Sequence, residues 1–282
     1  MRTAEWDAHF FDRSLAFEPF LPLSGQIRVF TNWPAFQDLN NLKQLACEGV
    51  ATCSGMPVQF VSQISEGKKN SGYSGNAVPR HYENRIYLTG EVPTRQENWH
   101  DFFNALVWLT FPKAKAALNQ IHFQSLHNNV RNEAEKRGPL RDAATLFDES
   151  GVIVLSSRSE WITLLQQHKW KAVFWRHRAS IPASMRFILF GHALYEKMLD
   201  PYLGLTGKGV FFEVDEVFLH KPLTDRLRII DHWLADFLLH TLSSTADLSP
   251  IPVLGYPGWT DANANSDYYD NQRYFRPLAS KK

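Results

Sequence analysis

The segment 98–108, NWHDFFNALVW, is apolar almost all round when it is read as a helix, yet it carries polar side chains. His100 and Asn104 are four residues apart and would share one helix face. A polar group buried there without a partner costs ~1–3 kcal/mol, so such groups either find partners in the core or line a cleft. Because histidine acts as an acid, a base or a ligand near neutral pH, we predict His100 as a catalytic residue and Asn104 as a substrate contact.

Asp101 and His122 extend this prediction. Asp101 is a second catalytic candidate, unless it only stabilises the positive N-terminus of its helix. His122 lies at the apolar boundary of the next helix, which Pro112 separates from the first. We therefore expect His122 to face His100 and to contact substrate, so that His100, Asn104 and His122 line one cavity.

Carboxylates gather where the pattern predicts a β-hairpin. Residues 144–147 and 152–155 are apolar, and the DESG sequence between them is typical of a turn. Asp148 and Glu149 could bind a divalent cation there, which makes both candidate metal ligands. Turns also select such residues for conformational reasons alone.

Arg141 and Asp142 precede the first predicted strand. Because an unpaired charge beside an apolar strand would be costly, we predict that both side chains are buried and paired. Asp142 is a candidate acid–base residue, and Arg141 could bind an anionic substrate. A purely structural Arg–carboxylate pair is the alternative.

His192 and Glu196 are spaced i, i+4 on a predicted helix, and Gly191 precedes them. This spacing can place two ligands on one metal ion, or a glutamate can simply hold a histidine. Glycine costs about 1 kcal/mol inside a helix, which suggests that another segment approaches closely at Gly191. We predict His192 as catalytic and Glu196 as a metal ligand, within ~6 Å of His100 or Asp142.

Two later segments offer weaker candidates for substrate binding. Residues 204–209, GLTGKG, have neither the glycine spacing nor the Ser or Thr of a phosphate-binding P-loop, but Lys208 could complete a small anion-binding turn. Trp259 lies in an aromatic C-terminal tail and could stack on a ligand. A plain turn and a tail that is fixed to the core by its aromatic side chains are the alternatives.

The elements that would position these residues predict an α+β fold, which is predominantly helical, with a small antiparallel hairpin or sheet and an irregular aromatic tail. We expect a single globular domain over 1–282. The predicted helices are 34–48, a long region 97–136 broken at Pro112, 159–168, 183–199 and 223–242; the predicted strands are 58–62, 85–88 and the hairpin, with a loop at 67–75 and a wrapping tail at 249–282.

Composition narrows the function classes. Of the 282 residues, 44% are hydrophobic, and the formal net charge is +1. A net charge this close to zero argues against strong nucleic-acid binding. Cys47 and Cys53 are too few for a disulfide framework or a four-cysteine zinc site, which favours a cytoplasmic protein. No window reaches the ~20 apolar residues that span a bilayer, so no membrane partner is expected. The oligomeric state is left open.

Several sequence blocks occur in a specific order: NWHDFFNALVW at 98–108, FPKAK at 111–115 with Leu118, Asn119 and His122, RDA at 141–143, FDE at 147–149, GHAL at 191–194, the turn at 254–259 and FRP at 275–277. In this order they resemble a bacterial family named only as domain of unknown function 3025, over roughly residues 80–278. The resemblance implies a grouping of residues but no activity.

These residues favour an enzyme over two other classes. A divalent metal held by histidine and carboxylate would activate water for hydrolysis of an anionic substrate such as a phosphorylated one. The alternatives are an RNA- or protein-binding module and a small-molecule sensor or scaffold without catalysis. The first alternative depends on the basic residues Lys113, Lys115, Arg131, Lys136, Arg137 and Arg141.

Overall fold

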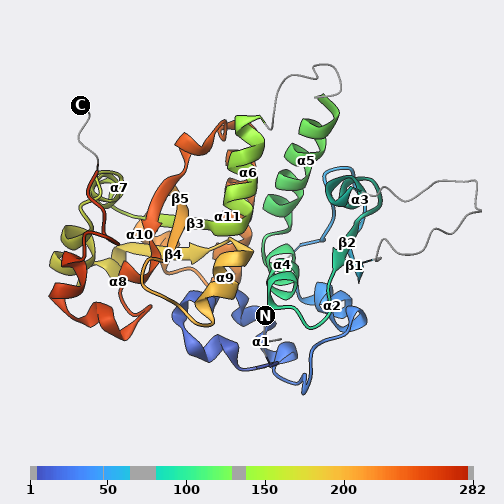
Figure 1. Ribbon diagram of the computed structural model, residues 1–282, viewed down its shortest axis with the longest axis horizontal. Coiled ribbons are helices and arrows are strands. Elements are labelled where there is room, and N and C mark those ends of the chain that lie inside the picture. Colours follow the sequence, from blue (N-terminus) through green and yellow to red (C-terminus); the bar gives the residue numbers. More distant parts are fainter. Residues whose placement is uncertain (1–4, 47, 64–80, 129–137, 279–282) are drawn as a thin grey trace, which may run out of the picture.

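The computed structural model describes residues 5–46, 48–63, 81–128 and 138–278 (Figure 1). Its core is a four-stranded sheet made of β3 (Gly151–Ser156), β4 (Met185–Leu189), β5 (Thr206–Glu213) and β6 (Ser249–Pro252). The strand order is β4-β3-β5-β6; β3 pairs parallel with β5 and antiparallel with β4, and β6 pairs antiparallel with β5. Every residue of β3 is buried, as expected of an apolar strand covered on both faces.

Helices make up most of the rest, so the predicted α+β class with predominant helix is confirmed. The helices are α1 (Leu21–Ile27), α2 (Phe36–Leu42), α3 (Tyr82–Thr89), α4 (Trp99–Thr110), α5 (Pro112–Asn128), α6 (Pro139–Ser150), α7 (Ser159–Gln166), α8 (Ile181–Ser184), α9 (His192–Met198), α10 (Glu216–Leu219) and α11 (Leu223–His240). Short 3-10 segments are Phe10–Arg13, Leu15–Phe20, Lys43–Leu45, Thr245–Asp247, Val253–Gly255, Asp261–Ala264 and Ser266–Asp270, and Ala172–Arg176 is a π-helical turn. Thus α2, α7 and α11 fall where helices were predicted.

The predicted break at Pro112 is confirmed, because α4 ends before it and α5 begins with it. Proline suits a first helical position, where its missing N–H is not needed. Asp231 on α11 completes this helix start: its two carboxylate oxygens accept hydrogen bonds from the backbone N–H groups of Lys113, at 2.9 Å, and Ala114, at 2.8 Å. The predicted helical residues 129–136 and the loop 67–75 lie outside the described residues.

The predicted β-hairpin around DESG is wrong. Residues 139–150 form the helix α6, and only the second predicted strand exists, as β3. The reason is the spacing of Ala143, Ala144 and Phe147, which places three buried side chains on one helix face. Asp148 and Glu149 therefore lie in the last turn of α6, directly before the sheet begins.

The predicted strand at 85–88 is also wrong, since these residues belong to α3. The strand comes later, as β2 (Glu91–Thr94), and pairs in parallel with β1 (Gln59–Ser62), where a strand was predicted. Gly90 separates α3 from β2 in the left-handed region, with φ of 74°. A Cβ at Gly90 would lie 2.1 Å from the backbone oxygen of Pro57, so this turn needs glycine.

The helix predicted at 183–199 is divided into three elements. The middle of the predicted helix, Met185–Leu189, instead forms strand β4, because it pairs with one edge of β3 in the sheet. The short helices α8 and α9 flank β4. His192 is consequently the first residue of α9, and Gly191 precedes the helix instead of interrupting it.

The C-terminal tail packs on the sheet, as the sequence predicts. The Tyr256 ring stacks on Phe187 of β4 at 4.6 Å between centroids, and its hydroxyl donates to the backbone oxygen of Met185. Trp259, a predicted substrate contact, is 4% exposed and packs against the same two aromatic rings. Its position is that of a core residue. In the part of the chain that the structure describes, no helix combines the length and apolar character needed to cross a membrane.

Candidate metal centre

Three predicted site residues from separate elements converge on one point. The Nε2 atoms of His100 on α4 and His192 on α9 lie 3.0 Å apart, and Glu149 Oε1 on α6 lies 3.7 Å from His192 Nε2. Ligand atoms of all three residues lie within 4.8 Å of one another. Two nitrogens on a tetrahedral zinc ion are ~3.3 Å apart, given bonds of ~2.0–2.1 Å. The arrangement therefore has the spacing of a two-histidine, one-carboxylate metal site.

Gly191 is what lets α9 approach the end of α6. A Cβ on Gly191 would lie 2.4 Å from Ser150 Cα and 2.5 Å from the backbone oxygen of Glu149. The close approach predicted at this glycine is therefore present. Since His192 follows Gly191 directly, the contact brings its ring beside the Glu149 side chain.

A carboxylate lies behind each histidine ring. Glu196 Oε2 is 3.1 Å from His100 Nδ1, and Asp148 Oδ1 is 3.8 Å from His192 Nδ1. Histidine ligands are usually oriented through their second nitrogen by such groups. Asp148 and Glu196, both predicted as metal ligands, thus lie where they would orient ligands, whereas Glu149 lies beside the two Nε2 atoms.

Lys115 holds Asp148 from the other side. Its Nζ lies 2.6 Å from Asp148 Oδ1 and 5.6 Å from the centroid of the Trp108 ring, and the side chain is only 5% exposed. Burial alone would raise the pKa of Asp148, but Lys115, followed by His192, brings it below the ordinary value. Asp148 is therefore an anion at neutral pH.

Burial also tunes the metal-facing groups. It lowers the pKa of His192 to about 3, against the opposing effect of Asp148, so this ring is neutral and can offer a lone pair. It raises the pKa of Glu149, an effect that His100 opposes. His192 is 6% exposed on its side chain while Glu149 is 42% exposed, so the centre is closed on one side and open to solvent on the other. An open coordination position distinguishes catalytic metal sites from structural ones.

Asp101 does not lie at this centre but supports α4. Its carboxylate accepts two hydrogen bonds from the Arg95 guanidinium and one from the Arg95 backbone, while its own N–H donates to Asn98 Oδ1. This is the alternative role at the helix N-terminus that the sequence left open. It fixes the turn of α4 that carries His100.

The prediction that Arg141 and Asp142 are both buried and paired is wrong. Asp142 is exposed and Arg141 is half-buried, and no ion pair of either with another described residue is found. Their position in the first turn of a helix, not before a strand, explains this. Arg141 still lowers the pKa of His122 and of Glu83, so it lies within electrostatic reach of the interior.

Lys208 lies in strand β5, opposite Gly151 and Pro250, and the predicted anion-binding turn around it is therefore wrong. Asn104 shares a face of α4 with His100 and donates from Nδ2 to Tyr82 Oη at 3.1 Å. His122 is 6% exposed, and burial lowers its pKa to about 4 although Asp148 opposes the shift. The structure thus places His122 in electrostatic reach of Asp148.

Lys115, Glu83 and Asn119 belong to this region and were not predicted as site residues. A signal for Lys115 exists in the sequence: it lies between alanines in FPKAKAAL, and Asn119 and His122 follow at helical spacing. Glu83 had no such signal, because its segment was read as the approach to a strand.

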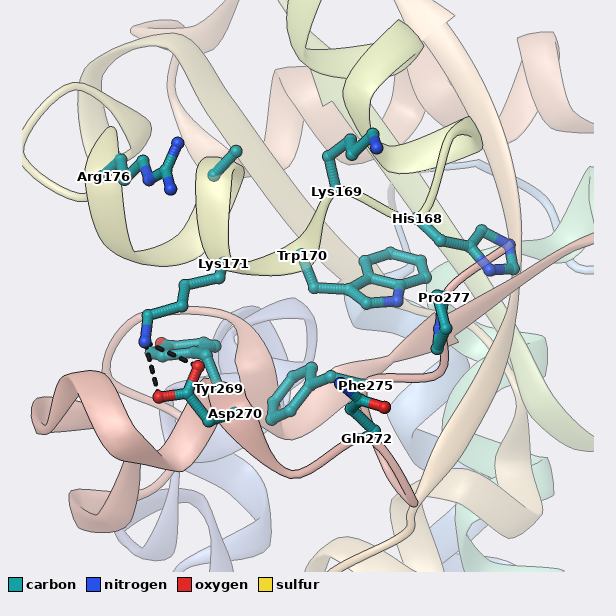
Figure 2. Close-up of a pocket in the computed structure, with 11 residues that line it drawn as sticks. His168, Lys169, Trp170, Lys171, Arg176, Tyr269, Asp270, Gln272, Phe275 and Pro277 are labelled. Atoms are coloured by element: carbon teal, nitrogen blue, oxygen red, sulfur yellow. Dashed lines mark hydrogen bonds and ion pairs between the residues drawn. The ribbon is translucent and has the colours of Figure 1, made fainter. Parts of the chain in front are cut away.

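A depression whose lining contains none of the three candidate ligands lies where the tail meets the π-helical turn (Figure 2). It has a volume of about 450 Å³. Lys171 and Asp270 form an ion pair at its edge, at 2.6 Å, and the rings of Trp170, Tyr269 and Phe275 are each 4% exposed. The depression therefore lies along the interface between the C-terminal tail and the segment 168–176.

The chain belongs to the family described as protein of unknown function (DUF3025), whose model matches residues 70–279. This match contains all three residues of the candidate metal centre. Neither the curated proteins nor the solved structures contain a match to this chain.

Proposed function

We propose that this protein is a metal-dependent hydrolase whose divalent ion, such as Zn²⁺, is bound by His100, His192 and Glu149. The observation that carries the proposal is the convergence of these three side chains from α4, α9 and α6, with their ligand atoms within 4.8 Å. Two imidazoles and one carboxylate with an open side are a recurrent donor set of catalytic metal sites.

The rival arrangement is a metal-free hydrogen bond between the two imidazoles. In that state the neutral ring that donates from Nε2 would carry no proton on Nδ1, yet that nitrogen faces a carboxylate in both rings, Asp148 in His192 and Glu196 in His100. A metal on Nε2 would place the proton of His192 on Nδ1, facing the Asp148 carboxylate 3.8 Å away. Metal binding would thus give both nitrogens of the buried His192 ring a favourable contact, Nε2 with the ion and Nδ1 with Asp148.

Held by His100, His192 and Glu149, the ion would supply a nucleophilic water at neutral pH for the addition of water across the scissile bond. Lys197 lies within electrostatic reach of Glu149, and together with the ion it favours an anionic substrate at this place.

The binding-module alternative has less support among the described residues. Lys113 pairs with Glu48 at 3.5 Å, and Lys115 is buried against Asp148. Arg131, Lys136 and Arg137 lie outside the described residues. We keep the cytoplasmic location as part of the proposal, in keeping with Cys53, which is a free and exposed thiol.

Metal analysis and an activity screen test this function together. We expect the purified full chain to bind stoichiometric zinc, and His100→Gln, His192→Gln and Glu149→Gln each to lose it. Asp142→Asn is the matched control, because this exposed carboxylate lies on the same helix as Glu149. The zinc-loaded protein should hydrolyse a phosphate monoester, a phosphate diester or a carboxylic ester of p-nitrophenol.

Two results would contradict the proposal. Wild-type protein that binds no divalent ion would remove the metal centre. Stoichiometric zinc with no turnover of any substrate class would favour the sensor or scaffold.

A further inference from the structure

One face of α5 is polar although it is buried. Lys115, Asn119 and His122 are spaced i, i+4 and i+7, so they share that face, and each is at most 6% exposed. The helix packs against α11, α6 and α3. A packed helix normally buries an apolar face, so these three residues, the polar stripe of α5, need a reason to be inside.

Two acceptors beside the stripe have no partner. Asn119 Nδ2 donates to the backbone oxygen of Glu83 at 3.0 Å and to its carboxylate at 2.8 Å, which fixes the amide orientation and leaves Asn119 Oδ1 alone. Asn104 donates to Tyr82 and its Oδ1 is likewise unpartnered. Asn104 is 7% and Asn119 3% exposed, so solvent at the surface does not satisfy them. Both atoms call for a group that donates hydrogen bonds.

Most charges inside this region are paired or suppressed, and the half-buried Arg141 adds a positive charge within electrostatic reach. Lys115 is paired with Asp148, and His122 is neutral at pH 7 because burial lowers its pKa to about 4. Burial raises the pKa of Glu83 to about 7, so its carboxyl is only partly ionised at neutral pH. Such surroundings favour an uncharged donor over a strongly charged ligand.

The stripe is continuous with the candidate metal centre. Asn104 lies one turn from His100 on the same face of α4. Lys115 binds Asp148, whose other neighbour is His192. Asn104 and Asn119 also lie in one region, because they donate to the adjacent residues Tyr82 and Glu83 of α3.

We propose that Asn104 and Asn119, with His122, bind the part of the substrate that is rich in hydrogen-bond donors, while its scissile group lies at the metal ion. This inference rests on the proposed function and deepens it. The ligand chemistry is an uncharged group with several O–H or N–H donors, found in polyols and in primary amides. The anionic group expected from the sequence belongs at the metal ion and not at these amides.

Soaking and titration with simple probes test this inference. Crystals of the zinc-loaded full chain would be soaked separately with erythritol, malonamide and inorganic phosphate, and the same probes titrated by NMR in solution. We expect erythritol or malonamide to donate to Asn104 Oδ1 and Asn119 Oδ1, and the one that binds identifies the donor as hydroxyl or amide. Asn119→Leu should weaken binding at least tenfold; Asn104→Leu serves if that variant does not fold.

Thr110→Val is the matched control, because Thr110 Oγ1 is also buried and unpartnered but lies at the far end of α4 from His100. Zinc-loaded protein that holds only water at Asn104 and Asn119, that prefers phosphate there, or that loses as much binding in the Thr110 variant would overturn the inference. Zinc content is measured in parallel. Donor probes that bind to protein unable to take up zinc would support the donor site while refuting the metal-centred function.

Discussion

The C-terminal tail and the interior between α3, α4, α5 and α6 both bury polar side chains, but they satisfy them differently. In the tail, Asn263 is 0% exposed, yet its Nδ2 donates to the backbone oxygens of Leu254 and Tyr256 and its Oδ1 accepts from Arg178. Among the described residues, no unpartnered buried side-chain atom lies in 249–278, whereas Asn104, Asn119 and His192 each carry one.

This is the difference we expect between polar groups that hold a fold and polar groups that bind a ligand. Most buried polar groups that only hold a fold are satisfied within the protein, because each unmade hydrogen bond costs ~1–3 kcal/mol; Thr110 Oγ1 and Arg226 Nε are exceptions here. Groups that keep a free donor or acceptor at such a cost are expected where a ligand completes them. The predictions below test this division, beginning with the largest expected effect.

Asn263→Leu should strongly destabilise the protein. The substitution removes one hydrogen-bond partner each from the Leu254 carbonyl, the Tyr256 carbonyl and the Arg178 guanidinium, which together should cost about 3–5 kcal/mol. Asn119→Leu should cost about 1–2 kcal/mol less, because it loses the two hydrogen bonds from Nδ2 to Glu83 but none at Oδ1. Urea denaturation measures both, and equal losses would erase the contrast between the two regions.

Gly191→Ala should affect stability and metal binding together. The new Cβ would meet backbone atoms of Ser150 and Glu149 that cannot move aside cheaply, so about 1–3 kcal/mol of stability should be lost. Zinc affinity should fall as His192 is displaced from Glu149. Gly25→Ala, at a site with open space, is the control. Unchanged zinc affinity in the Gly191 variant would show that the close approach does not build the centre.

Asp148→Asn should weaken zinc binding by about 10–100-fold, the usual effect of removing a group that orients a metal-bound histidine. Glu196→Gln should do the same through His100 with a smaller loss, because Glu196 is 44% exposed. Competition with a chelator measures both affinities. Equal affinity in all three proteins would mean that the rings are oriented by packing alone.

His122→Asn should flatten the loss of stability in acid. Burial lowers the pKa of His122 to about 4 in the folded protein, below its ordinary value. Between pH 6.5 and 4 the folded state therefore binds fewer protons than the unfolded state, and the free energy of unfolding decreases as the pH is lowered. Removing this group should recover about 1 kcal/mol across one pH unit in that range.

Asp231→Asn provides the opposite case. Burial raises the pKa of Asp231 to about 7, so its contribution is greatest at low pH and is lost as pH rises towards 7. The Asp231→Asn variant should therefore lose more stability than the wild type as the pH falls from 7 to 4. Thermal unfolding between pH 4 and 7 measures both slopes, and slopes that shift in the same direction would contradict these protonation states.

The sequence predicted the residues of the candidate metal centre better than their arrangement. His100, His192 and Glu149 were all identified from local chemistry, but His192 was expected to act with Glu196 at i, i+4. In the structure Glu196 reaches His100, 96 residues away along the chain. Local periodicity holds no information about which helices meet, so such pairings cannot be read from it.

Two errors came from weighing local signals. The turn signal at Asp148–Gly151 was given more weight than the helical spacing of Ala143, Ala144 and Phe147, which places these residues in α6. The apolar run at 183–199 was assigned to one helix, but its middle pairs with β3 as β4. The helices α4 and α11, whose buried apolar residues recur at helical spacing, were predicted well because packing and propensity agree there.

The carboxylate of Asp231 that closes the start of α5 comes from 117 residues further along the chain. During synthesis, α5 leaves the ribosome long before α11 exists, and its first N–H groups must meanwhile be satisfied by water. Helix α5, which carries Lys115 and Asn119, therefore reaches its final stability only when α11 has packed against it. A nascent chain stalled before Leu223 should contain all three residues of the candidate metal centre, while Asp231 is not yet present to stabilise the start of α5.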